Sequence, residues 1–176
     1  MAGSEGERAA TAIEYAIALV AARSWPQSKL REKIAARYDA GQADEAIARM
    51  RELRMVDDDA WAERFARERF ERSGRGRHRI RAELLQRGID AVTADEALAR
   101  VLNGEAEREK AAAVLASMRV RLGRGEADSE TAMDSPSTAA AASRRRAAQR
   151  LKNRLFRRML ARGYPAALVR DLLDVS

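Results

Sequence analysis

Two clusters of arginine are the residues of this chain that are best suited to bind another molecule. The first cluster surrounds the single histidine of the chain and consists of Arg75, Arg77, Arg79 and Arg81. A guanidinium presents five N–H donors in a planar fork, which matches the oxygens of a phosphate or a carboxylate. The cluster therefore predicts a contact with nucleic acid or with an acidic protein surface.

The second cluster lies on one predicted helix, residues 144–162, which holds nine basic residues and no acidic one. Its candidate binding residues cover one side of that helix: Arg146, Arg150, Arg154, Arg157 and Arg158. The chain has a net charge of +7, and without these nine residues the remainder would be slightly negative. A GC-rich genome would explain the many arginines, but not a helix without Asp or Glu. The cluster therefore indicates a surface that meets phosphate or an acidic partner.

The residue inventory predicts no catalytic site, metal site or cofactor. The chain has no cysteine, which excludes a thiol nucleophile, a disulfide and a thiolate metal site. His78 is the only histidine and lies between two arginines, so it offers no multi-histidine metal site and no Ser–His–acid set. Gly74 and Gly76 are not followed by the Lys-Ser/Thr pair of a P-loop. We therefore expect a binding protein that is not an enzyme.

Composition predicts a soluble cytoplasmic protein. Of the 176 residues, 46% are hydrophobic and 35% are charged. The most apolar window, residues 12–22, is far shorter than the roughly 20 residues that span a bilayer, and it contains Glu14. The residues before it carry Glu5 and Glu7 against a single Arg8, whereas a signal peptide begins with positive charge. We expect no membrane contact, and nothing in the sequence requires more than a monomer.

Helices must position the arginine clusters, because β-branched runs are almost absent and aromatic residues make up only 5% of the chain. The spacing of apolar residues predicts nine helices, at residues 7–23, 29–37, 43–53, 55–72, 78–87, 93–102, 105–122 and 144–162, and from 165 onward. Ser28 and Thr93 are predicted N-caps, and Gly88 a left-handed helix end. Residues 123–143 are predicted to be a flexible insertion. Within it, residues 138–142 could form a helical extension of the predicted helix at 144–162.

The nine helices group into three predicted repeats of three helices, at residues 7–54, 55–103 and 105–175, the last with the insertion at 123–143. The middle helices of the last two repeats align, since Ile80, Leu84, Gly88 and Ile89 match Leu155, Met159, Gly163 and Tyr164. In the first repeat Tyr38 stands at the glycine position, so that turn is predicted to differ. Arg81 falls inside the apolar arc of its helix and is expected to lay its stem on the core. Trp61 and Phe65 are interpreted as core residues.

Several short motifs follow one another along residues 12–102. In the second repeat they are Val56-Asp57-Asp58, Trp61-Ala62, Phe65, Gly74-x-Gly76, Ile80-Arg81-x-Glu83-Leu84 and Arg87-Gly88-Ile89. In the first repeat they are Ala16, Leu19 and Ser28-x-Leu30-Arg31-x-Lys33. In the order and spacing of these motifs the chain resembles the RecX family, the regulatory proteins of the RecA recombinase. The last repeat fits this family in outline only, because its insertion is longer than expected.

The resemblance implies an elongated, curved, all-α array of three-helix repeats. It also implies binding to the RecA–single-stranded-DNA filament, which would limit filament growth, strand exchange, ATP turnover and co-protease activity in recombinational repair and the SOS response. The arginine clusters would then meet acidic RecA surface, filament DNA or both. One alternative is a helical protein that binds single- or double-stranded DNA directly. A third interpretation is a scaffold whose arginines are only solvated.

Overall fold

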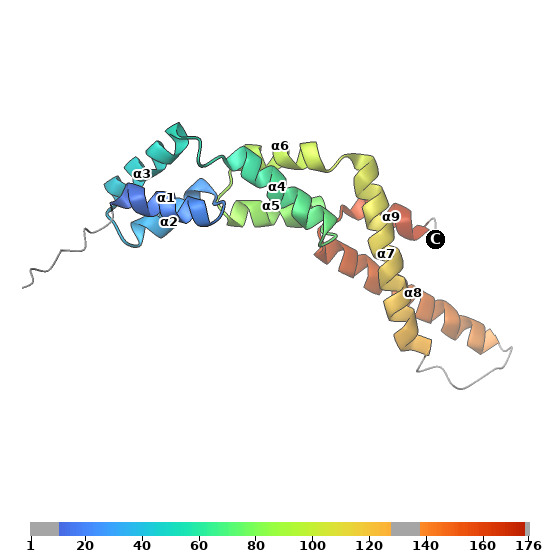
Figure 1. Ribbon diagram of the computed structural model, residues 1–176. Helices are drawn as coiled ribbons and strands as arrows, with labels where there is room; N and C mark the ends of the chain where they lie inside the picture. Colours follow the sequence, from blue (N-terminus) through green and yellow to red (C-terminus); the bar gives the residue numbers. More distant parts are fainter. Residues whose placement is uncertain (1–10, 128–137, 175–176) are drawn as a thin grey trace, which may run out of the picture. The chain divides into compact units, whose positions relative to one another are not determined.

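The structure of the protein, a computed structural model, describes residues 11–127 and 138–174 (Figure 1). These residues form nine α-helices and no strand, which confirms the all-α prediction. The helices are α1 (Ala12–Ala22), α2 (Gln27–Ala35), α3 (Ala40–Glu52), α4 (Asp58–Glu71), α5 (Arg77–Gln86), α6 (Ala91–Val101), α7 (Gly104–Ala127), α8 (Thr138–Ala161) and α9 (Ala166–Asp174). No helix in the described part of the chain is long and apolar enough to cross a membrane.

The chain divides into two compact units. Unit 1 comprises Met1–Phe65 and Glu83–Ala97, and unit 2 comprises Ala66–Ala82 and Leu98–Ser176. Helices α4 and α5 therefore contribute residues to both units. The division of the chain into three repeats stays a prediction.

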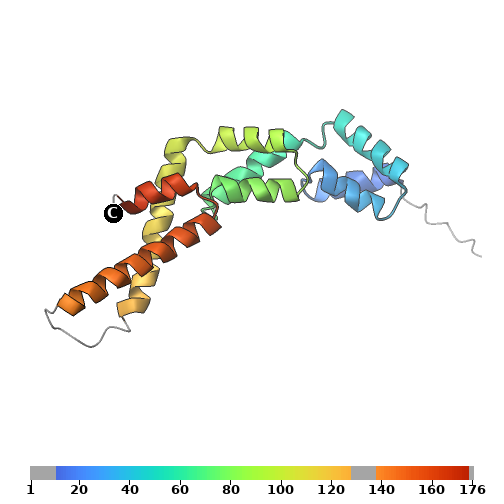
Figure 2. The same cartoon turned by 180° about the vertical axis from the view of Figure 1, so that it is seen from behind.

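Helices α1, α2 and α3 pack on one another in unit 1, and they lie side by side in both views of the ribbon (Figures 1 and 2). Their core includes Leu30 and Ile34 of α2 and Met50 of α3, all fully buried. Ala16 and Ala46 are also fully buried, and such small residues let the helix axes come close together. Burial of these apolar side chains stabilises three helices that would be too short to remain folded alone.

Helices α7, α8 and α9 form the core of unit 2. Leu115 of α7 meets Leu155 and Met159 of α8 in this core, together with Val169 of α9. Tyr164 lies three residues after the end of α8 and is 1% exposed, so its ring is part of the same core. The apolar side of α8 is therefore used for packing, which leaves its opposite side for the arginines.

Several helix ends differ from the sequence prediction. Ser28 is not a cap, because α2 already begins at Gln27, and the Ser28 hydroxyl instead donates to the carbonyl of Arg87 at 2.8 Å. Helix α6 is capped by Asp90 rather than Thr93, since the Asp90 carboxylate accepts the Thr93 N–H at 3.0 Å. Hydrogen bonds from the backbone and the side chain of Thr93 lower the pKa of Asp90 below its usual value. A polar residue that starts a helix is easily confused with a neighbour one turn away.

The predicted insertion is shorter than expected. Helix α7 continues to Ala127 and α8 begins at Thr138, so both ends of the segment 123–143 are helical. The ability of residues 138–142 to extend the next helix is confirmed. Residues 128–137 lie outside the described part of the chain. Ala is the strongest helix former, and the run of alanines before Ser143 explains the early start of α8.

The glycine-terminated helix ends are confirmed. Gly88 and Gly163 have backbone φ angles of +77° and +90°, which residues with a Cβ atom rarely adopt. After each glycine an N–H reaches back to the last helical turn, from Ile89 to the Leu84 carbonyl and from Tyr164 to the Met159 carbonyl. Tyr38 has no such left-handed turn around it, as predicted for the first repeat.

Two glycine turns of unit 2 meet backbone to backbone. The Gly76 N–H donates to the Arg162 carbonyl at 2.9 Å, and the His78 N–H donates to the Gly163 carbonyl at 3.0 Å. A Cβ on Gly76 would overlap the main chain of Gly163 and Tyr164, and a Cβ on Gly163 would overlap the main chain of Arg79. We call this contact the glycine joint. It ties the start of α5 to the end of α8, and it requires glycine on both sides.

Replacement of Gly163 by Ala should destabilise the protein strongly. The added Cβ meets the backbone of Arg79, which cannot move aside as a flexible side chain can, and φ of +90° is strained for alanine. We expect a loss of more than about 2 kcal/mol in the free energy of unfolding, measured by urea denaturation.

Gly104→Ala is the matched control for this variant. A Cβ at Gly104 meets nothing within 4 Å, and the residue lies at the start of α7. This substitution should be neutral or stabilising by about 0.5 kcal/mol, because alanine loses less chain entropy on folding. Equal unfolding midpoints for the two variants would contradict the glycine joint.

The phenol of Tyr164 is locked in its neutral form. Its hydroxyl donates to the Gly74 carbonyl at 3.0 Å. Burial raises the pKa of Tyr164 from 10.0 to about 12, because the phenolate would lose its water. In the unfolded chain this tyrosine ionises near its ordinary pKa. Its contribution to stability is therefore complete below pH 10 and is lost as the pH rises toward 12.

Tyr164→Phe should change how stability depends on pH. At neutral pH the variant loses one buried hydrogen bond, which costs about 1 kcal/mol. Since the phenylalanine cannot ionise, the gap in unfolding free energy between wild type and variant should shrink as the pH rises from 10 toward 12. Urea titrations of both proteins across that range measure it. A gap that stays constant or widens would show that the phenol is not held neutral.

Candidate functional site

The exposed side of α8 carries a basic surface. Arg146, Arg150, Arg154, Arg157 and Arg158 are all exposed, together with Arg144 and Arg145. The apolar residues of the same helix face the core, where Leu155 and Met159 are buried. The structure thus brings the predicted arginines of this helix onto one face, which we call the α8 arginine face. Such a face attracts phosphates or carboxylates from a distance.

A second basic feature lies beside the glycine joint. Arg75 and Arg79 line a depression of about 420 Å³ with Arg162, Ser73 and Ala161. Arg162 is oriented by a 3.1 Å hydrogen bond from its guanidinium to the Ser73 carbonyl. No acidic residue lines this depression, so it suits a single anionic group. Arg162 was not among the predicted site residues. It ends the stretch 144–162, which has nine basic residues and no acidic one, and this charge pattern could have identified it.

Arg77 has an internal partner. Its Nε donates to Glu107 Oε2 at 2.7 Å, its backbone N–H donates to Glu107 Oε1 at 3.2 Å, and the guanidinium also reaches the Leu102 carbonyl. Glu107 is only 3% exposed, so removal of Arg77 would leave a buried carboxylate unpaired. The sequence did not reveal this pair, because 30 residues separate its members. The binding role that we predicted for Arg77 stays a prediction.

Arg81, the remaining residue of the first cluster, and the neighbouring His78 differ in exposure. Arg81 is half-buried, which agrees with a stem that packs on the core. His78 is exposed, and its backbone N–H belongs to the glycine joint. Of the first cluster, Arg75 and Arg79 are therefore the residues that the structure brings to a common depression with a residue of α8.

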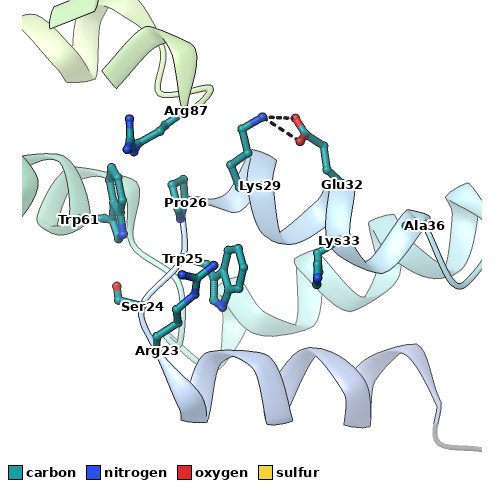
Figure 3. A pocket seen from close by; sticks show the side chains of 10 residues that line it. All are labelled: Arg23, Ser24, Trp25, Pro26, Lys29, Glu32, Lys33, Ala36, Trp61 and Arg87. Carbon is teal, nitrogen blue, oxygen red and sulfur yellow. Dashed lines mark hydrogen bonds and ion pairs between the residues drawn. The ribbon is translucent and has the colours of Figure 1, made fainter. Parts of the chain in front are cut away.

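Unit 1 contains a pocket that sequence reasoning missed. Its volume is about 620 Å³. Figure 3 shows Trp25 and Trp61 on either side of Pro26, with Arg23 next to Trp25. The remaining lining residues are Ser24, Lys29, Glu32, Lys33, Ala36 and Arg87. Trp61 was interpreted as a core residue, but it is only half-buried and forms a wall of this pocket.

Three hydrogen bonds hold the walls of this pocket together. Ser28 at the start of α2 binds the carbonyl of Arg87, and Ser24 accepts from Arg64 at 2.9 Å. The Gln27 N–H donates to the Asp58 carboxylate at 2.8 Å. Burial raises the pKa of Asp58, although this hydrogen bond acts in the opposite direction. The loop before α2 is therefore fixed to α4 and to the end of α5 by contacts within unit 1.

Comparison with known proteins gives consistent results. A model of the family "RecX, second three-helix domain" matches residues 57–98. A regulatory protein RecX of Thermus thermophilus is 36% identical over 110 residues, which cover 62% of this chain and 72% of that protein. A regulatory protein RecX of Mycobacterium sp. (strain JLS) is 29% identical over 174 residues, which cover 98% and 85% of the two chains.

Solved structures show the same fold. The crystal structure of RecX from Lactobacillus salivarius superposes with a TM-score of 0.73 at 17% identity and covers 94% of this chain and 96% of that one. At such low identity this similarity concerns the fold alone. The extent and identity of the Thermus match go further, and with the match of the family model they show that this chain belongs to the RecX family of regulatory proteins.

Proposed function

We propose that this chain is a non-enzymatic modulator of RecA that binds the RecA–single-stranded-DNA filament. It would limit filament growth and thereby reduce strand exchange, ATP turnover and co-protease activity in recombinational repair and the SOS response. The main support for this proposal is that the chain belongs to the RecX family of regulatory proteins. The α8 arginine face supports it, because an exposed helix face with many cations and no acidic residue suits a polyanionic assembly.

The α8 arginine face would act mainly by attraction and orientation. Its arginines are exposed, so each contact with a partner would be worth little alone and would weaken with salt. Several such contacts together set the rate of association and the choice of partner. The depression at Arg75, Arg79 and Arg162 would add one more anchored anion contact in the same unit. The proposal uses no chemistry beyond binding.

RecA-dependent ATP hydrolysis on single-stranded DNA tests this proposal. Wild-type protein should lower the steady-state rate at stoichiometric concentration. The triple variant Arg150→Glu, Arg154→Glu, Arg158→Glu should require about tenfold more protein for the same effect. Each arginine is expected to make one exposed contact with the filament, worth about 0.5 kcal/mol, and all three contacts are lost. Circular dichroism should show unchanged helix content, since all three side chains are exposed.

A second triple variant controls for net charge. Arg37, Arg49 and Arg54 are exposed arginines of unit 1, and their replacement by glutamate changes the total charge by the same amount. This control should inhibit RecA as the wild type does. If stoichiometric wild-type protein leaves ATP hydrolysis unchanged, the proposed function is wrong. If both triple variants lose the same activity, the effect belongs to net charge and not to the α8 arginine face.

Direct binding to DNA is the second candidate function, and the arginine-lined depression favours it. Several guanidiniums that line one depression fit a phosphate of the nucleic-acid backbone. In this case the protein should bind naked DNA without RecA, and the affinity should fall steeply with salt. Fluorescence anisotropy of labelled DNA between about 50 and 200 mM salt, the range over which such affinities change most, measures this. Tight binding to DNA with no capture of RecA would favour this function over the first.

A further inference from the structure

We propose that the pocket of unit 1 binds a nucleotide of a single-stranded nucleic acid, with the base against its aromatic walls and the phosphate beside the lysines of α2. This site is separate from the α8 arginine face and uses none of its residues. The inference concerns unit 1 alone and stands whether or not the protein regulates RecA. It rests on the walls, the charges and the size of the pocket.

The walls combine flat aromatic rings with guanidinium groups. The guanidinium carbon of Arg23 lies 3.6 Å from the centre of the Trp25 ring. On the other side Trp61 stacks on Phe65, with ring centres 5.1 Å apart and planes inclined by 13°. Phe65 is buried and does not line the pocket, whereas Arg87 does, and its guanidinium carbon lies 4.5 Å from the centre of the Phe65 ring. Bases stack well on aromatic rings and on guanidinium planes, so both walls suit a planar ligand.

The charges of the pocket favour an anionic ligand. Four basic side chains line it, from Arg23, Lys29, Lys33 and Arg87, against the single acid Glu32. Glu32 is already paired with Lys29 at 2.8 Å, as the dashed lines in Figure 3 mark. In the described part of the chain no carboxylate pairs with Lys33, which is exposed one helical turn after Lys29. Lys33 is therefore ready to meet a phosphate.

The combination of flat walls and positive charge selects the class of ligand. An acidic peptide would match the charges, but it makes no use of the Trp25–Arg23 stack or of the Trp61 ring. A DNA duplex would match the charges too, but each of its bases is covered on both faces by its neighbours. A single strand offers both an open base face and a phosphate. The pocket volume of about 620 Å³ lies in the range that holds a small organic ligand, which suits one or two nucleotides.

Trp25 and Trp61 are the only two tryptophans of the chain, and both line this pocket. Intrinsic tryptophan fluorescence of the full-length protein therefore reports on this pocket alone. Oligonucleotide binding at the α8 arginine face would change the anisotropy of a labelled strand without a direct contact to either indole. The two signals separate this site from the proposed function.

The experiment titrates the full-length protein with unlabelled oligo(dT) and follows tryptophan emission. We expect saturable quenching by oligo(dT), and little quenching by a DNA duplex, by thymidine monophosphate or by polyglutamate. Arg23→Gln with Lys33→Gln should weaken this quenching about tenfold. Lys33→Gln alone should lower the slope of log affinity against log salt by about 0.7, which corresponds to one phosphate contact on a single strand.

Arg49→Gln is the matched control, since Arg49 is an exposed cation of unit 1 outside the pocket and lies on α3. It should leave the quenching curve unchanged. Absence of quenching by oligo(dT) would overturn the proposal, as would equal weakening by Arg49→Gln. Stronger quenching by polyglutamate would assign the pocket to an acidic peptide, and equal quenching by thymidine monophosphate would assign it to a free nucleotide. Both of these results contradict a site for a single strand.

Discussion

The backbone contact between two glycine turns is the constraint on which unit 2 depends. At the glycine joint the main chain around Gly76 lies directly on the main chain around Gly163, and two N–H groups donate across the contact. Side chains are excluded there, so the approach is closer than ordinary helix packing permits. The joint fixes the first turn of α5 against the end of α8. Arg79 and Arg162, which flank it, are thereby brought to one depression.

A related contact occurs in unit 1. Gly88 ends α5 with a left-handed turn, and a Cβ there would overlap the side chain of Ser28 at the start of α2. The Ser28 hydroxyl donates to the carbonyl just before Gly88, at Arg87. In each unit, then, a glycine that ends one helix lies on the first turn of an earlier one. This recurrence supports the proposed repeats, and it also places Arg87 at the pocket of unit 1.

Local signals in the sequence were sufficient for most of the fold. Helical periodicity and the glycines at 88 and 163 predicted the helices and two of their ends, because these features depend on neighbouring residues only. The errors arose where a distant residue decides the outcome. Ser28 looks like a cap, but its hydroxyl donates to the carbonyl of Arg87. The pair between Arg77 and buried Glu107 also depends on a distant residue, and it leaves the binding role of Arg77 a prediction. Trp61 fits a helical apolar stripe, yet the loop at Pro26 leaves it in a pocket wall.

The central claim is that the α8 arginine face of this RecX-family protein meets the RecA–single-stranded-DNA filament. A cryo-electron microscopy structure of filaments decorated with the full-length protein tests it most directly. The account predicts ordered density for the protein on the filament, with Arg150, Arg154 and Arg158 turned toward RecA carboxylates or DNA phosphates. Undecorated filaments at saturating protein, or bound protein whose α8 arginine face points to solvent, would contradict it.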